Sequence, residues 1–384
     1  MFRPVVLVLT ALAVGASASR SSDESALIAG RFKVADLLAI LKKAKNDKDL
    51  DPVAKEKARN QRIAALALLA TSGGKNRAVV KGVIETLKED PEPKVRVAAA
   101  RALGQMGKEA RGAIEALADA LKSDKADPVR EAAATALGKM VPDSKKVLSV
   151  LVAALKDKNA ETRAAAASTL GLLGGDAELA LPNLLAALQD RSLDRFTRIY
   201  SAYAVSRLDL SGTKAVPALT AALTDKESHP ELRKAAAEAL GRYGQLAQAA
   251  AEDLGKALVA RDNDVDVRRA AIVALGKIGA EARAAWPNIQ TAMLKDEDAS
   301  VRYEAIRVAG ALGKEEPKVV AALAEAGLKD KNLEARLAAI EELAHLGSAA
   351  KDALPTLREI AAKDSRIAVR RAAQEALKKI QTSR

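Results

Sequence analysis

The chain has 384 residues and a formal net charge of +12, with 62 Lys and Arg against 50 Asp and Glu. It contains no Cys and two His, and only 2% of its residues are aromatic although 49% are hydrophobic. Without Cys the chain cannot form thiolate zinc sites, iron–sulfur sites, disulfides or a thiol nucleophile, and two His cannot build a multi-histidine metal centre. Ala, Leu and Val must therefore form the core, which favours many close helix–helix contacts over one deep core.

The N-terminal residues have the pattern of an export signal. Arg3 supplies a positive charge, residues 5–16 form an uncharged apolar run, and Ala-Ser-Ala at 16–18 offers small residues to signal peptidase. The apolar run is shorter than the roughly 20 residues that span a bilayer. We therefore expect cleavage near Ala18/Ser19 and a mature chain in the periplasm or outside the cell, without a transmembrane segment. The alternative is an uncleaved amphipathic or core segment.

One arginine recurs along the chain at intervals of 33 to 35 residues. The recurring arginines are Arg62, Arg96, Arg130, Arg163, Arg198, Arg233, Arg268, Arg302, Arg336 and Arg370. Counted from this arginine as position zero, small or apolar residues usually fall at −1, +2, +3, +6, +7 and +10, as in residues 95–104 and 129–138. This spacing predicts a helix with one flat, Ala-rich edge. Gly often follows at +8 or +11, where we expect it to end the helix.

A second apolar-periodic segment lies between successive arginines, for example over residues 113–121, and an Asp closes it. The Asp precedes the arginine by six residues in seven copies and by eight in two, at Asp190 and Asp225. Capping residues follow at Asp127, Asn159, Asp298 and Asn332, and a proline recurs in the first helix at Pro182, Pro217, Pro287 and Pro355. Each period is therefore predicted to be helix, turn, helix, turn, and the pairs stack because neither helix can bury its face alone.

The recurring Asp, Val-Arg, Ala-Ala and Ala-Leu-Gly pattern resembles HEAT repeats of the short, phycobilisome-lyase-like kind over about residues 31–380. The resemblance implies an all-α, right-handed α-solenoid of about ten HEAT-like helix pairs. A signal peptide (1–18) and a flexible segment (19–30) would precede the solenoid, and a C-terminal tail (381–384) would follow it. The resemblance also implies that the recurring Asp and Arg form a polar ladder between repeats. It does not imply one function, because scaffolds, lyases, hydroxylases and regulators share such repeats.

The enzyme functions of similar repeats do not match these residues. A deoxyhypusine hydroxylase resemblance implies an iron site of His-Glu pairs, but His229 precedes Pro230 and His345 precedes Leu346. A phycobilin lyase resemblance implies a tetrapyrrole carrier inside a cell, which the export signal contradicts. HEAT-fold DNA glycosylases stack aromatic side chains against DNA, a substrate that an exported chain does not meet. We therefore expect no catalytic residue, no metal, no cofactor and no nucleic-acid partner.

The second helix of each pair lines the concave wall of a HEAT-type stack, and its positions +1, +5 and +9 should face a ligand. In four consecutive repeats these positions carry six basic side chains and two tyrosines. The candidate partner-binding residues are Tyr203, Arg207, Lys234, Arg242, Arg269, Lys277, Tyr303 and Arg307. Tyrosine beside arginine is typical of a protein-binding hot spot, and the cations suit an acidic peptide. Cations at +9 also complement the helix dipole, so a merely solvated face remains the alternative.

Two aromatic residues are expected in the core. Tyr200 stands at +2, where other repeats carry a core Ala, so we expect it to pack inside, whereas Tyr203 should point outward. Trp286 precedes the recurring proline and should also be buried.

These patterns together predict a non-catalytic, exported scaffold that binds a protein or peptide on the concave face of the solenoid. One alternative is a lyase-like or enzyme-accessory protein that cradles a small ligand in the groove. A third possibility is a basic binder of anionic envelope polymer. A pocket with convergent polar groups would favour the small ligand, an open groove would favour the peptide, and steep salt sensitivity would favour the polymer.

Overall fold

A computed structural model describes residues 33–43, 50–72, 74–140, 145–260, 264–313 and 318–383. The predicted signal peptide and the segment over 19–30 lie outside the described residues. The chain divides into two compact units, residues 1–208 (unit 1) and 209–384 (unit 2). All regular structure within the described residues is helical. None of the helices described combines the length and the apolar character that crossing a membrane requires.

Within the described residues the α-helices form ten pairs in chain order, each an odd-numbered helix followed by an even-numbered one. Unit 1 contains α3 (Val34–Lys42), α4 (Pro52–Ser72), α5 (Arg77–Glu89), α6 (Pro93–Met106), α7 (Ile114–Ser123), α8 (Asp127–Met140), α9 (Lys145–Ala154), α10 (Ala160–Leu173), α11 (Leu181–Gln189) and α12 (Arg195–Leu208). Unit 2 contains α13 (Ala215–Thr224), α14 (Pro230–Arg242), α15 (Ala251–Val259), α16 (Val265–Ile278), α17 (Trp286–Lys295), α18 (Ala299–Leu312), α19 (Lys318–Lys329), α20 (Leu333–Leu346), α21 (Leu354–Lys363) and α22 (Ile367–Thr382). The predicted all-α solenoid of about ten helix pairs is confirmed.

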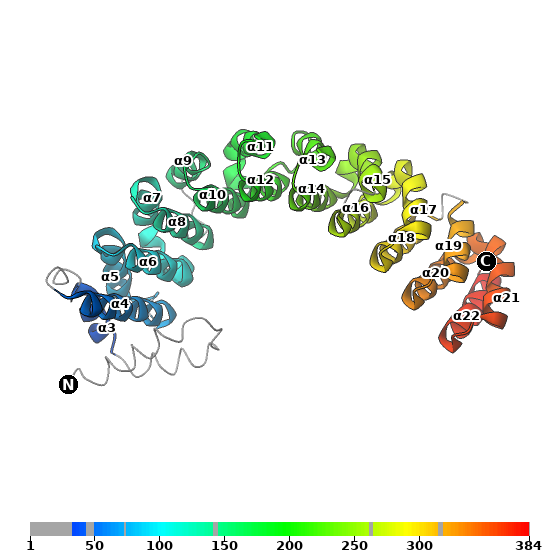
Figure 1. The fold of residues 1–384 in the computed structure, drawn as a ribbon, viewed down its shortest axis with the longest axis horizontal. Coiled ribbons are helices and arrows are strands. Elements are labelled where there is room, and N and C mark those ends of the chain that lie inside the picture. The colour runs from blue at the N-terminus through cyan, green and yellow to red at the C-terminus, as the bar shows by residue number, and fades with distance from the viewer. Residues whose placement is uncertain are drawn as a thin grey trace. The chain divides into compact units, whose positions relative to one another are not determined.

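Within each unit the even-numbered helices form one layer and the odd-numbered helices the other (Figure 1). We call the even-numbered helices of a unit its inner layer, because they lie on the inner side of that unit's curve (Figure 1). Each recurring arginine lies on an inner helix. The predicted caps Asn159, Asp298 and Asn332 precede inner helices and accept hydrogen bonds from backbone N–H groups. Asp127, by contrast, is the first residue of α8 and its carboxylate pairs with Arg130 at 2.8 Å.

The recurring glycines have two different roles. Those at +11 begin short 3₁₀ segments and have positive φ, which favours Gly because it lacks a Cβ; they are Gly107, Gly174, Gly244, Gly279 and Gly347. Those at +8 lie inside the inner helices, so the expectation that they end the helix is wrong. A Cβ added to Gly171 of α10 would lie 2.9 Å from Cα of Ala204 in α12. The glycine at +8 therefore lets successive inner helices approach backbone to backbone.

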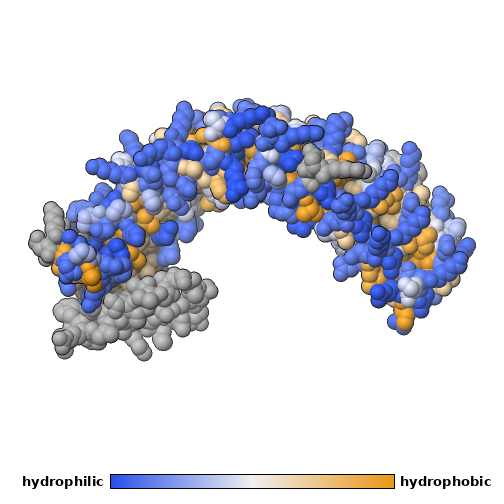
Figure 2. All heavy atoms as spheres, in the orientation of Figure 1, coloured by the Kyte–Doolittle hydropathy of each residue, from blue (hydrophilic) through white to orange (hydrophobic). Residues whose placement is uncertain are grey.

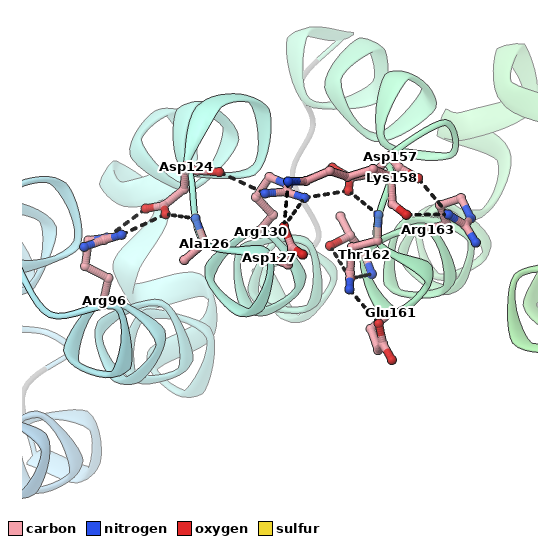
Figure 3. A network of polar contacts seen from close by, with 11 residues as sticks. Arg96, Asp124, Ala126, Asp127, Arg130, Asp157, Lys158, Glu161, Thr162 and Arg163 are labelled. Carbon is pink, nitrogen blue, oxygen red and sulfur yellow. Dashed lines mark hydrogen bonds and ion pairs between the residues drawn. The ribbon is translucent and has the colours of Figure 1, made fainter.

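The predicted polar ladder is confirmed (Figure 3). The Arg96 guanidinium donates to both carboxylate oxygens of Asp124, at 2.8 and 2.9 Å, and to the backbone oxygen of Asp90 at 2.9 Å. Arg130, Arg163, Arg302 and Arg336 likewise join the backbone oxygen of the Asp before them to the carboxylate of an Asp in the next repeat. The ion pairs of this kind are Arg62–Asp90, Arg96–Asp124, Arg130–Asp157, Arg163–Asp194, Arg268–Asp296, Arg302–Asp330 and Arg336–Asp364. Arg198 differs, because it donates to the backbone oxygen of Leu188.

The ladder changes register at one of the two repeats in which the recurring Asp stands eight residues before the arginine. Arg163 pairs with Asp194 at 2.6 Å, and Asp190 instead accepts a hydrogen bond from the Ser192 backbone at 2.9 Å.

Burial raises the pKa of Asp124, but hydrogen bonds from Arg96 and from a backbone N–H outweigh this effect and hold the pKa below its usual range. A carboxyl group with a depressed pKa stabilises the fold above about pH 4, and this contribution is lost as the pH falls through the depressed value.

We expect the ladder to contribute much more to stability than exposed ion pairs do. In Arg302→Met, the Asp330 carboxylate would lose both guanidinium bonds, at 2.8 and 3.0 Å, while remaining only 4% exposed. Removing one partner of a largely buried pair costs about 3 kcal/mol. Urea unfolding followed by circular dichroism measures this loss. The control is Lys256→Met, which removes a side chain that is 61% exposed beside Glu252 and should lose well under 1 kcal/mol. Equal losses in both variants would contradict the structural role of the ladder.

The close helix contact predicts opposite results for two glycines of unit 1. Gly171→Ala places its new Cβ against the Ala204 backbone, so α10 and α12 must separate. We expect a loss of about 1–2 kcal/mol in the free energy of unfolding, because overpacking outweighs the better helix propensity of Ala. Gly175→Ala meets no atom within 4 Å and should be neutral or slightly stabilising. Thermal unfolding of both variants tests the contact, and a neutral Gly171→Ala would refute it.

Candidate functional site

The structure places all eight predicted partner-binding residues on inner helices, where each is exposed or half-buried. Tyr203 and Arg207 belong to α12 in unit 1, and the other six belong to α14, α16 and α18 in unit 2. The predicted positions +1, +5 and +9 therefore do face away from the core. The ion pairs of these side chains separate them into groups with different chemistry.

Two of the cations share one carboxylate. Lys234 of α14 donates to Asp266 of α16 at 2.8 Å, and Arg269 of α16 lies 3.8 Å from the other oxygen of the same carboxylate. The hydrogen bond with Asp266 raises the pKa of Lys234 above its ordinary value, and the same bond lowers the pKa of Asp266. Lys234 and Arg269 are thus held in place, with half of their charge balanced from within the protein.

Two further cations make no ion pair within the described part of the chain. Arg242 and Lys277 lie in the last turns of α14 and α16, and both are exposed. Cδ of Lys277 lies 3.4 Å from the position that a Cβ on Gly241 would take, so the lysine side chain packs against the last turn of α14, the turn that also carries Arg242. We call Lys234, Arg242, Arg269 and Lys277 the basic ridge.

Arg307 forms ion pairs that the sequence pattern did not predict. Its guanidinium lies 2.7 Å from the carboxylate of Glu342 and 3.4 Å from that of Glu341, both in α20. Glu342 stands at +6, where six of the other nine repeats carry Ala, and is only 7% exposed. Its carboxylate fits against Gly310 of α18, where any Cβ would collide with it. The positive charge of Arg307 is therefore balanced by carboxylates of the next repeat.

The helix α12 differs from the other inner helices by its exposed aromatic side chains. Phe196 is 47% exposed and Tyr200 is 39% exposed, so the prediction that Tyr200 packs in the core is wrong. The reason is steric: the equivalent Ala132 and Ala235 are almost completely buried, and a tyrosine ring does not fit in that space. We call Phe196, Tyr200, Tyr203 and Arg207 the α12 stripe. The prediction for Trp286 is confirmed, because its side chain is 5% exposed.

A separate cavity of about 900 Å³ lies in unit 1 among α3, α4 and α5. Leu38, Leu41 and Gly82 form apolar parts of its lining, and charged side chains of both signs surround them; these are Lys42, Lys55, Lys81, Glu85, Glu89, Asp90 and Glu92. Nothing in the residue pattern predicted this cavity, because it depends on how α3 packs against α5. In the described residues no group of three His, Asp or Glu side chains is arranged to hold a metal ion.

The HEAT-repeat family model matches residues 52–138, 114–206, 216–286, 251–331 and 287–378. The chain belongs to the HEAT-repeat family. The matches cover almost all of the described helices, as the recurring arginine predicted. A search of curated proteins found no sequence match.

Solved structures that resemble this HEAT-repeat chain include three karyopherin structures. Kap121p alone aligns with 99% of this chain and 45% of its own, at a TM-score of 0.62 and 13% identity. Kap121p bound to Nup53p aligns with 99% of this chain and 50% of its own, at 0.52 and 15%. Kap95p, from a structure with RanGDP, aligns with 90% of this chain and 59% of its own, at 0.52 and 17%. The chain thus spans about half the length of these proteins, and the likeness shows a shared fold.

The ion pairs predict which arginines of unit 2 are chemically available. We expect phenylglyoxal to modify Arg307 several-fold more slowly than Arg242, because the Glu342 carboxylate holds the Arg307 guanidinium. Glu342→Ala should raise the Arg307 rate and leave the Arg242 rate unchanged, since Ala stands at this position in other repeats. Peptide mass spectrometry of timed reactions measures both rates in one sample. Equal rates for the two arginines in the native chain would contradict the assignment.

Proposed function

We propose that this HEAT-repeat protein is an exported, non-catalytic scaffold that binds an acidic segment of a protein partner through the basic ridge of unit 2. The proposal of export rests on the charged start, the apolar run and the small residues at 16–18. The proposal of a scaffold rests on an inner layer that displays side chains from successive helices at a regular spacing.

The observation that carries the proposal is the presence of two exposed cations, Arg242 and Lys277, in the last turns of the neighbouring helices α14 and α16. A partner carboxylate can bind them without breaking an ion pair of the protein, and charge-assisted bonds of this kind are the stronger hydrogen bonds. Lys234 and Arg269 add positive charge on the same two helices, against the carboxylates of Glu238 and Asp266. The excess of cations would attract an acidic segment before contact is made.

The solved structures support this use of the fold. One of the karyopherin structures has Kap121p bound to Nup53p, and in another Kap95p binding induces the switch loops of RanGDP to adopt the GTP-bound conformation. We extend only the general property, protein binding by a HEAT-type stack, to this chain. A small ligand in the groove of the inner layer has less support, because the cavity described above lies in unit 1 among α3, α4 and α5.

Reversing the two unpaired cations should abolish capture of the partner. We expect Arg242→Glu/Lys277→Glu to capture about one tenth or less of the partner that the native mature chain captures from envelope extract. The reason is that two attractions to the partner's carboxylates become repulsions. Quantitative mass spectrometry of the captured proteins measures the difference, and circular dichroism verifies that the variant is folded. Loss of the two last-turn cations costs only some tenths of a kcal/mol of helix stability each.

The matched control is Lys295→Glu/Lys318→Glu, which makes the same change in net charge at exposed positions of α17 and α19, two odd-numbered helices outside the inner layer. This control should capture the same partner as the native chain. If both charge-reversed proteins lose the partner equally, only net charge matters, as expected for binding to an anionic polymer. If neither loses it, the basic ridge is a solvated face and the proposal fails.

A further inference from the structure

The helix α12 carries a second group of outward-facing side chains, separate from the basic ridge. Phe196, Tyr200, Tyr203 and Arg207 stand at i, i+4, i+7 and i+11, so they form one continuous line along a single face of the helix. The chain contains eight aromatic residues in all, and three of them lie in this line. The stripe therefore contains three of the few aromatic side chains of the protein, of which Phe196 and Tyr200 are exposed and Tyr203 is half-buried.

Packing within the repeat does not account for the exposed rings. At the two positions of Phe196 and Tyr200, other inner helices carry small or polar residues, such as Ser300 at −2 and Ala235 at +2. Exposed large aromatic side chains contribute little to folding, whereas Tyr and Arg are enriched at the centres of protein interfaces. The aromatic residues Phe196 and Tyr200 thus give α12 an exposed apolar surface that the packing of the repeats does not require.

The charges at the ends of the stripe specify what it can bind. The Arg195 guanidinium lies 4.7 Å from the centroid of the Phe196 ring at the start of α12, and Arg207 lies in its last turn. No Asp or Glu occurs between residues 195 and 208. The two arginines are twelve residues apart, which is about 18 Å along a helix. An extended peptide covers that distance in five to six residues.

We propose that the α12 stripe binds an extended peptide in which two acidic residues, five to six positions apart, flank apolar side chains. The carboxylates meet Arg195 and Arg207, and the apolar side chains lie on the rings of Phe196, Tyr200 and Tyr203. This charge complementarity selects an acidic protein segment over a neutral apolar one. The stripe lies within unit 1, so the proposal does not rest on the basic ridge of unit 2.

The probe is the fluorescein-labelled peptide Glu-Leu-Pro-Leu-Pro-Leu-Glu, whose prolines favour an extended backbone. Its binding to the native mature chain is followed by fluorescence anisotropy. Phe196→Ser/Tyr200→Ala rebuilds the residues that other repeats carry at these positions, so this variant should fold. We expect it to bind at least about tenfold more weakly, as is typical when hot-spot aromatics are removed. Arg207→Gln should weaken binding several-fold, and replacing both Glu of the peptide by Lys should abolish it.

Two control variants separate this surface from others. Leu179→Ala removes a 76% exposed apolar residue of unit 1 outside the stripe and should leave binding unchanged. Arg242→Glu/Lys277→Glu should also leave it unchanged, which distinguishes failure here from failure of the proposed function. No binding by the native chain, or equal binding by Phe196→Ser/Tyr200→Ala, would overturn the proposal. So would dimerisation that the same variant abolishes, since a second copy would then occupy the stripe.

Discussion

Successive inner helices touch at a point where only small side chains fit between them. At this contact the glycine at +8 of one helix faces the residue at +6 of the next, as in Gly171 with Ala204 and Gly241 with Ala274. The arginine of the ladder lies about two turns away along the same helix, and it fixes a second point between the same repeats. Two fixed points on each helix determine both its distance and its direction relative to its neighbour. The Ala-rich, aromatic-poor composition follows from this geometry, because a larger core residue would open the contact.

Large residues at these crowded positions have two different outcomes. Tyr200 replaces a buried Ala at +2 and its ring emerges on the surface of α12. Glu342 replaces a buried Ala at +6, but its carboxylate remains inside because Gly310 leaves room for it and Arg307 neutralises it. The same kind of substitution therefore gives an exposed recognition group in one repeat and an internal ion pair in another. The difference depends on whether the neighbouring repeat supplies both space and an opposite charge. On the face seen in Figure 2, hydrophobic residues are scattered among hydrophilic ones.

Features that repeat with the period of the chain could be predicted from the sequence, and features set by one particular neighbour could not. The helix pairs, the caps at Asn159, Asp298 and Asn332, and the Arg–Asp ladder all recur, so many copies support each inference. The exchange of Asp190 for Asp194 depends on which carboxylate the turn brings within reach of Arg163. Position +9 likewise predicted exposure for Arg242, but nothing in the pattern showed that Arg307 would pair with Glu342. The outward face was predictable, whereas the partners of its charges were not.

The two proposed surfaces would contribute to binding in different ways. Exposed, unpaired cations such as Arg242 and Lys277 act over the Debye length, so they would mainly raise the rate of encounter and would respond to salt. Aromatic rings such as Phe196 and Tyr200 act only on contact, by removing apolar area from water, so they would mainly slow dissociation. A partner with one acidic segment for the ridge and one acidic, apolar segment for the stripe would gain from both. Each surface belongs to a different compact unit, and a linked pair of sites increases avidity only when the span between them suits the partner. Relative placement of the two units would then determine which partners are retained.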